Sequence, residues 1–210
     1  MRRPRLMIAD DHALVVEGLR KLLERVFDLV GVVDDGRTLL TEAQAHRPDV
    51  ILLDISMPGL NGLDVARKLR TLIPESRVIF VTMHADRTYA AEALAAGGAA
   101  YVVKHSAASE LLLAIRAALA GKTYVSRMLR PRDEESTPGR ERKLASPITA
   151  RQREVLQLVA EGRTGKEIAA LLRISAKTVE FHKARIAERL DLHSAAEFTR
   201  YAIAHHLIGP

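Results

Sequence analysis

The chain has 210 residues, a length that suits one large domain or two small ones. Its apolar content of 48% is ordinary for a globular protein. No apolar run approaches the roughly 18 to 20 residues of a membrane span, and the basic start is followed by too short an apolar run for a secretory signal. The absence of cysteine excludes disulfides and thiolate metal sites, so we expect a cytoplasmic protein without a membrane partner.

The net charge of +6 is concentrated in the C-terminal half of the chain. Residues 1–125 carry 16 Lys and Arg against 15 Asp and Glu, whereas residues 144–210 carry ten against seven. An excess of positive charge in the second half agrees with a nucleic-acid partner there.

Short apolar runs alternate with longer amphipathic stretches through the first 125 residues. The runs are 6–9, 29–33, 50–53, 78–81 and 100–103, and the helical stretches lie near 13–26, 36–46, 62–72, 87–96 and 108–120. Continuous apolar character indicates strands buried on both faces, as in a parallel sheet. Five such units predict a doubly wound α/β fold with a five-stranded parallel sheet, whose ligands bind at the carboxyl ends of the strands.

The alternating pattern ends after Val125. Residues 126–146 mix Arg, Asp, Glu, Pro and Gly with few apolar side chains, which is typical of a solvated linker. We therefore expect three parts: a first domain at 1–125, a linker at 126–146 and a second domain at 147–210.

The second domain is predicted to be all-α, with four short helices near 150–160, 165–172, 176–190 and 195–206. Three of the helix starts match the capping-box pattern of Ser or Thr followed three residues later by Glu or Gln: Thr149 with Gln152, Thr164 with Glu167, and Ser194 with Glu197. Ser175 is a further N-cap candidate. Only residues 173–175 separate the second helix from the third, which is the spacing of a helix-turn-helix.

Side chains able to handle a phosphoryl group follow four of the predicted strands. Asp10 and Asp11 follow the first strand, Asp54 the third, Thr82 ends the fourth, and Lys104 follows the fifth. Three clustered carboxylates repel one another unless a cation intervenes, and Mg²⁺ is the hard divalent ion that such oxygen ligands favour. With Lys104 nearby, this site could neutralise an incoming phosphoryl group while Asp54 acts as nucleophile.

At these positions the chain resembles the receiver domains of two-component response regulators, over about residues 1–125. The matching motifs are IADDH at 8–12, LDISMPGLNG at 53–62, VTMH at 81–84 and GAAYVVK at 98–104. The resemblance implies a flavodoxin-like receiver in which Asp54 is the phosphoacceptor. It also implies that Lys104 contacts the phosphoryl group and that Thr82 and Tyr101 change position as a switch. Mg²⁺ would be held by Asp10, Asp11, Asp54 and the backbone carbonyl of Ser56. His105 departs from the pattern, because many receivers have a proline in a cis peptide there.

The predicted helix 176–190 has an apolar face with Val179, Ile186 and Leu190 and a polar face that fits the major groove of DNA. The motifs ITARQREVL at 148–156, KEIA at 166–169 and KTVEFH at 177–182 resemble the LuxR-type helix-turn-helix, so the whole chain is similar to the NarL/FixJ subfamily. By that resemblance Glu180, Phe181 and Ala184 point at bases. The residues expected to contact the DNA backbone are Lys177, Thr178, His182, Lys183 and Arg185. The last helix would contribute to dimerisation on DNA, and Gly165 replaces the asparagine common in relatives.

We therefore expect a non-enzymatic transcription factor whose binding to double-stranded DNA is switched when a sensor histidine kinase phosphorylates Asp54, with a homodimer as the DNA-bound form. Two alternatives remain at this stage. One is a metal-dependent phosphohydrolase with an Asp nucleophile, although the D-x-D motif of haloacid-dehalogenase-like enzymes is missing after the first strand. The other is a receiver that works without phosphate, as a dimerisation module only.

Overall fold

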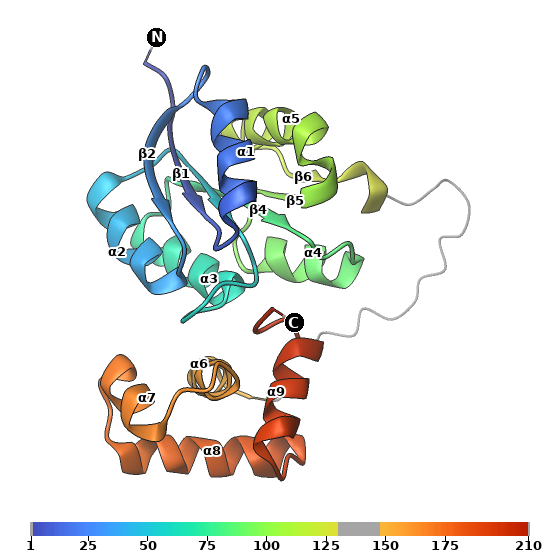
Figure 1. Cartoon of the computed structure of the whole chain (residues 1–210). Coiled ribbons are helices and arrows are strands. Elements are labelled where there is room, and N and C mark those ends of the chain that lie inside the picture. The colour runs from blue at the N-terminus through green and yellow to red at the C-terminus, as the bar shows by residue number, and fades with distance from the viewer. Residues whose placement is uncertain (1, 130–147, 210) are drawn as a thin grey trace. The chain divides into compact units, whose positions relative to one another are not determined.

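The computed structural model describes residues 2–129 and 148–209, which fall into two compact units (Figure 1). The first unit is a parallel sheet with helices on both faces. Its strands are β1 (Arg5–Ala9), β2 (Asp28–Val33), β3 (Val50–Leu53), β4 (Arg77–Thr82), β5 (Ala100–Val103) and β6 (Tyr124–Val125). Its α-helices are α1 (Ala13–Leu23), α2 (Gly36–His46), α3 (Gly62–Leu72), α4 (Arg87–Ala95) and α5 (Ala107–Leu119). The short 3₁₀ turns η1 (Lys104–Ser106) and η2 (Arg127–Leu129) complete it.

The sheet has the strand order β2-β1-β3-β4-β5-β6, and all its pairs are parallel. Helices α1 and α5 pack on one face, and α2, α3 and α4 pack on the other (Figure 1). Every residue of β3 is at most 1% exposed, which agrees with the continuous apolar runs in the sequence. The chain reverses its direction of travel across the sheet between β1 and β3, and this is where a doubly wound fold builds its site.

The structure corrects the predicted linker boundary and strand number. Tyr124 and Val125 form a sixth strand that pairs with β5, beyond the five strands expected. Ser126 is fully buried and Leu129 is 7% exposed within the core that contains Tyr101, so these two residues belong to the first unit, although Arg127 and Met128 between them are exposed. Leu129 stands among charged residues and gives no periodic apolar signal, so the sequence pattern of this segment is that of a linker. The rest of the predicted linker, 130–146, lies outside the described residues.

The second unit consists of α6 (Ala150–Ala160), α7 (Gly165–Leu172), α8 (Ala176–Leu190) and α9 (Ala195–Ala204), close to the predicted bounds. Its core includes Val155, Ile168, Val179 and Ile186, all fully buried. The turn between α7 and α8 is tight because Arg173 adopts a left-handed conformation with φ 53°. At 15 residues α8 is the longest described helix, and in the part of the chain that the structure describes no helix is long and apolar enough to cross a membrane.

The helix caps follow the sequence pattern with one exception. Complete capping boxes form at Thr149 and Thr164, and Ser175 accepts a hydrogen bond from the backbone N–H of Thr178. The third box is only half formed: Ser194 accepts from the backbone N–H of Glu197, but the Glu197 carboxylate accepts from the backbone N–H of His193 instead of Ser194. The flexible Glu side chain reaches a donor one residue earlier, which a spacing rule does not distinguish.

A close backbone approach at the start of α3 generates a stability prediction. A Cβ atom on Gly62 would lie 2.1 Å from the backbone oxygen of Asp54 and 2.9 Å from the Cα of Ile55. Neither contact can be relieved by a side-chain rotation, because both atoms belong to the backbone. We expect Gly62→Ala to lower the free energy of unfolding in urea by about 2 kcal/mol or more.

The matched control is Gly18→Ala in the exposed middle of α1, where nothing lies within 4 Å of the added Cβ. This change should raise the free energy of unfolding by roughly 0.5–1 kcal/mol, since alanine loses less backbone entropy than glycine in a helix. Equal effects of the two substitutions would show that the close approach at Gly62 is unimportant.

Candidate acidic site and nucleic-acid interface

The carboxylates predicted from the strand ends lie together at the point where β1 and β3 are neighbours. The strand register pairs Ala9 with Leu53, so Asp10 and Asp54 are the next residues of the two strands. Both are buried, at 4% and 3% exposure, whereas Asp11 is exposed beside them. The register of the sheet therefore brings residues 44 positions apart in the sequence into one site.

Lys104 joins this site from the end of β5. Its Nζ lies 2.7 Å from Asp54 Oδ2 and 2.8 Å from Asp10 Oδ2. Asp54 Oδ1 accepts a hydrogen bond of 2.7 Å from the backbone N–H of Ile55. The lysine therefore bridges the two buried carboxylates.

The pKa values of Asp54 and Lys104 are governed by burial and by the contact between their side chains. Burial raises the pKa of the Asp54 carboxyl above its usual range, and the positive charge of Lys104 offsets only part of that rise. Burial lowers the pKa of Lys104, but the charge of Asp54 and the contacts with both carboxylates outweigh it, so the pKa of the lysine is raised. The ammonium stays charged at neutral pH and can face an anion.

His12 is a member of the site that the sequence reasoning did not single out. Its Nδ1 lies 2.8 Å from Asp11 Oδ1 and 3.1 Å from Asp10 Oδ1. Within the described parts of the chain, one group of carboxylates and imidazoles is close enough to hold a metal ion: Asp10, Asp11, His12 and Asp54, whose ligand atoms lie within 4.8 Å of one another. Its place directly after two aspartates was the available signal, and the three carboxylates fit a hard divalent cation.

Thr82 and Tyr101, the predicted switch residues, meet at the backbone of His84. Thr82 is fully buried, and its Oγ1 accepts from the backbone N–H of His84 at 3.4 Å. Tyr101 is also fully buried and its hydroxyl donates to the backbone oxygen of His84 at 2.8 Å. Burial raises the pKa of the Tyr101 phenol, so it remains a donor. Both side chains thus contact the backbone of His84, and their role as a switch stays a prediction.

Ser56 contributes a contact between two loops of the site. Its hydroxyl lies 3.1 Å from His84 Nε2, which links the loop after β3 to the loop after β4. The His84 ring also stacks on Tyr89 of α4, with ring centroids 5.6 Å apart. The group of Ser56 that is predicted to contact a metal ion is its backbone carbonyl, and this contact stays a prediction.

The segment after β5 takes a different course from that of receivers with a cis proline. No cis peptide bond occurs among the described residues, and Lys104, His105 and Ser106 form the 3₁₀ turn η1. The Lys104–His105 peptide is therefore trans, and the turn leads directly into α5.

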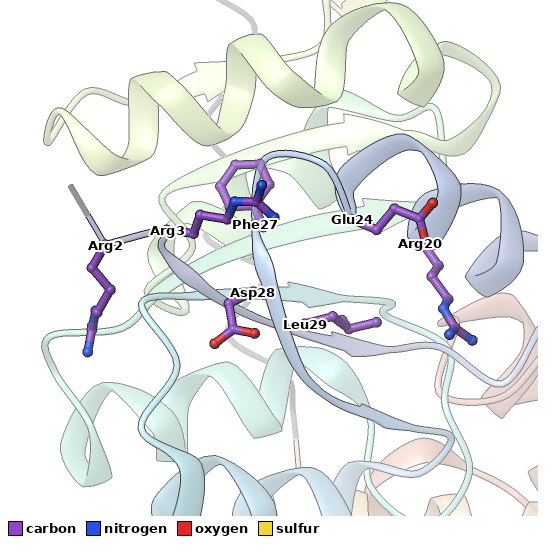
Figure 2. A pocket seen from close by; sticks show the side chains of 7 residues that line it. All are labelled: Arg2, Arg3, Arg20, Glu24, Phe27, Asp28 and Leu29. Carbon is purple, nitrogen blue, oxygen red and sulfur yellow. The ribbon is translucent and has the colours of Figure 1, made fainter.

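A separate hollow of about 410 Å³ lies at the opposite end of the sheet (Figure 2). It is lined by Arg2, Arg3, Arg20, Glu24, Phe27, Asp28 and Leu29. These residues precede β1, end α1 or begin β2, so they lie away from the strand ends that hold Asp10 and Asp54. The hollow contains none of the predicted site residues.

In the second unit, α8 presents the predicted DNA-contacting residues on its outer side. Val179 and Ile186 are fully buried, and Leu190 is partly buried against the same core. The exposed residues are Lys177, Glu180, Phe181, Ala184 and Arg185, and Thr178, His182 and Lys183 lie on the flanks with intermediate exposure. Phe181 is 59% exposed on this side of the helix.

Ion pairs within α8 organise the charges on this side. Lys183 Nζ lies 3.1 Å from Glu180 Oε1, and the Arg185 guanidinium lies 2.9 Å from Glu188 Oε2. The Arg185 guanidinium carbon also lies 5.8 Å from the centre of the Phe181 ring. The hydroxyl of Thr178 is 2.8 Å from that of Ser175, so it helps to cap the helix.

Comparisons with known proteins agree with both units. Residues 6–116 match the family described as "Response regulator receiver domain", and residues 146–202 match "Bacterial regulatory proteins, luxR family". The oxygen regulatory protein NreC of Staphylococcus epidermidis is 35% identical over 218 residues, which cover 97% of this chain and 99% of that protein.

Solved structures of similar proteins extend over nearly the whole chain. A structure of the RcsB response regulator of Salmonella typhimurium is 26% identical with a TM-score of 0.66 and covers 97% of this chain and 98% of that chain. A structure of two RcsB dimers bound to two parallel DNAs is 25% identical with a TM-score of 0.57, covering 95% and 98% of the two chains. The chain therefore belongs to the two-component response regulators of the NarL/FixJ subfamily, with a receiver domain followed by a LuxR-type helix-turn-helix domain.

Proposed function

We propose that a sensor histidine kinase phosphorylates Asp54 and that this modification switches the binding of α8 to double-stranded DNA. The observation that carries the proposal is the buried contact of 2.7 Å between Lys104 Nζ and Asp54 Oδ2, beside Asp10 at the strand ends. A carboxylate held next to an ammonium at the switch point of a doubly wound sheet is poised to receive an anionic group.

The proposed reaction forms a bond between an Asp54 carboxylate oxygen and phosphorus. The phosphorus–nitrogen bond of a phosphohistidine on the kinase breaks, and its electron pair returns to the imidazole, which takes up a proton. Lys104 neutralises charge on the phosphoryl oxygens, and the Thr82 hydroxyl donates a hydrogen bond to one of them after moving toward it. Tyr101 follows Thr82 through their shared neighbour His84.

The residues present fit a divalent cation, and we propose Mg²⁺. Asp10, Asp11, Asp54 and the backbone carbonyl of Ser56 would hold it, because hard cations favour oxygen ligands and three carboxylates repel one another without one. When bound, the ion supplies positive charge that neutralises the phosphoryl oxygens during transfer.

The proposed output is a homodimer on DNA with α8 of each copy in the major groove. RcsB, a relative in sequence and fold, forms dimers bound to DNA in its solved structure. Two copies related by a two-fold axis would contact two half-sites. We further propose that the chain acts in the cytoplasm, where its DNA target is found, and that it turns over no external substrate.

The first prediction concerns Asp54. We expect Asp54→Asn to abolish the shift that acetyl phosphate produces in phosphate-affinity gel electrophoresis, because an amide oxygen is a far weaker nucleophile than a carboxylate. The gain in DNA affinity upon treatment should disappear as well. Removal of divalent cations with EDTA should abolish the shift of the wild-type protein.

The control is Asp28→Asn, an exposed carboxylate at the start of β2, which should leave the shift unchanged. A gain in DNA affinity that survives in Asp54→Asn would contradict phosphorylation as the switch. Sustained release of phosphate from small phosphoesters would favour a phosphohydrolase instead.

The second prediction separates two kinds of contact on α8. Lys177→Ala should weaken binding about equally on all duplexes and reduce the slope of log K against log salt by about 1, because lysine neutralises one phosphate. Phe181→Ala should instead lower the preference for the selected site over a mismatched one by about 1 kcal/mol, because apolar groups read base edges.

Fluorescence anisotropy at several salt concentrations measures both effects, on a duplex selected from a random pool by the phosphorylated protein. Lys122→Ala, an exposed lysine of the first unit, is the charge-matched control and should change neither quantity. Equal affinities of all three variants and the wild type would rule out α8 as the contact surface.

A further inference from the structure

A buried carboxylate that the proposed reaction does not use lies in the first turn of α5, soon after Lys104 in the sequence. Glu110 of α5 is 7% exposed, and its Oε2 accepts a hydrogen bond of 2.7 Å from the hydroxyl of the fully buried Ser126. Both carboxylate oxygens also accept from the backbone N–H of Arg127, at 3.3 and 3.2 Å. A buried carboxylate costs stability unless its oxygens accept hydrogen bonds. Residues 126 and 127 supply those donors here.

The same serine hydroxyl holds the end of β5. Ser126 Oγ accepts from the backbone N–H of Val103 at 3.2 Å and lies 3.0 Å from the hydroxyl of Ser106. The Ser106 hydroxyl in turn donates to the backbone oxygen of Val103 at 3.1 Å. Both backbone polar groups of the residue before Lys104 are therefore in contact with serine hydroxyls.

These contacts bracket the turn that carries Lys104. Val103 precedes the turn and Ser106 is its last residue, and both contact Ser126. Residue 105 of the turn is histidine and not proline, and the Lys104–His105 peptide is trans. A network of hydrogen bonds fixes the backbone here instead, and the position of Lys104 Nζ between Asp10 and Asp54 depends on that backbone.

We propose that Ser126 and Glu110 are positioning residues for Lys104, and that through them a phosphoryl group on Asp54 tightens the segment at residues 126–127. The inference rests on the proposed phosphorylation of Asp54. If the network favours the lysine position that a phosphoryl group needs, then by linkage a bound phosphoryl group must favour the network. Residues 126–127 directly follow β6 and precede the second unit in the sequence. The hydrogen bonds of this segment would therefore depend on whether Asp54 carries a phosphoryl group.

The first test measures the binding of beryllofluoride, a phosphoryl analogue, in the presence of Mg²⁺ by isothermal calorimetry on the full chain. Ser126→Ala should raise the dissociation constant severalfold, up to roughly tenfold, because it leaves the N–H of Val103 without its acceptor and removes the hydroxyl donor of the Glu110 carboxylate. Glu110→Gln, which retains the volume and an acceptor oxygen, should have a smaller effect in the same direction. Ser76→Ala removes a partly buried hydroxyl bonded to Pro48 at the other end of the sheet and should have none.

A double-mutant cycle with Lys104→Met distinguishes positioning from general destabilisation. The effect of Ser126→Ala on beryllofluoride binding should vanish in the Lys104→Met background, because the serine acts through the lysine. An equal loss in both backgrounds would overturn the proposal. Should Ser126→Ala fail to fold, as judged by circular dichroism, the same cycle with Glu110→Gln decides.

The second test is amide hydrogen exchange of the wild-type chain. Beryllofluoride should slow exchange at the amides of Val103 and Arg127, whose acceptors belong to the network, and Ser126→Ala should remove this response. Binding without any change at these amides would overturn the coupling. A wild-type chain that binds no beryllofluoride would overturn both this inference and the proposed phosphorylation, whereas binding that is indifferent to Ser126 would overturn this inference alone.

Discussion

The contact of one buried ammonium with two buried carboxylates organises the receiver unit. Lys104 Nζ lies within 2.8 Å of both Asp10 and Asp54. Removing charges from water costs several kcal/mol per ion, and only close opposite charges offset that cost. Without Lys104, an ionised Asp54 would lower the stability of the fold, as the raised pKa of its carboxyl indicates. The two buried carboxylates carry one more negative charge than Lys104 balances, so the site can accept a further cation.

Much of this arrangement could be predicted from the sequence because it follows from strand ends. Continuous apolar runs define parallel strands, and residues that directly follow neighbouring strands must meet at one edge of the sheet. Asp10 and Asp54 lie together for this reason, whereas Lys104 follows β5, on the far side of β4, and reaches both carboxylates with its long side chain. The helix starts at Thr149 and Thr164 were equally accessible, since a capping box needs only residues three positions apart.

The parts that escaped sequence reasoning depend on contacts between distant residues or on a choice among equivalent donors. Ser126 contacts Val103 and Glu110 only after β6 has paired with β5, and a two-residue strand leaves no periodic signal. The His12 imidazole could have pointed to solvent, and its contact with Asp11 depends on a rotamer that spacing does not determine. Local sequence patterns thus define where helices and strands begin, whereas tertiary packing determines which side chains come into contact.

The charge pattern of α8 explains why a receiver is useful to this DNA-binding unit. Residues 144–210 have an excess of only three positive charges, and Glu180 and Glu188 already pair with two of the basic residues on the outer side of the helix. Each phosphate contact contributes to affinity through released counterions, so a helix with compensated charges binds weakly as a single copy. Joining two copies turns the second contact into an intramolecular one and can raise the overall affinity by about 10²–10⁴ without new contacts. Weak single-copy binding would thus let the proposed dimerisation control the occupancy of DNA.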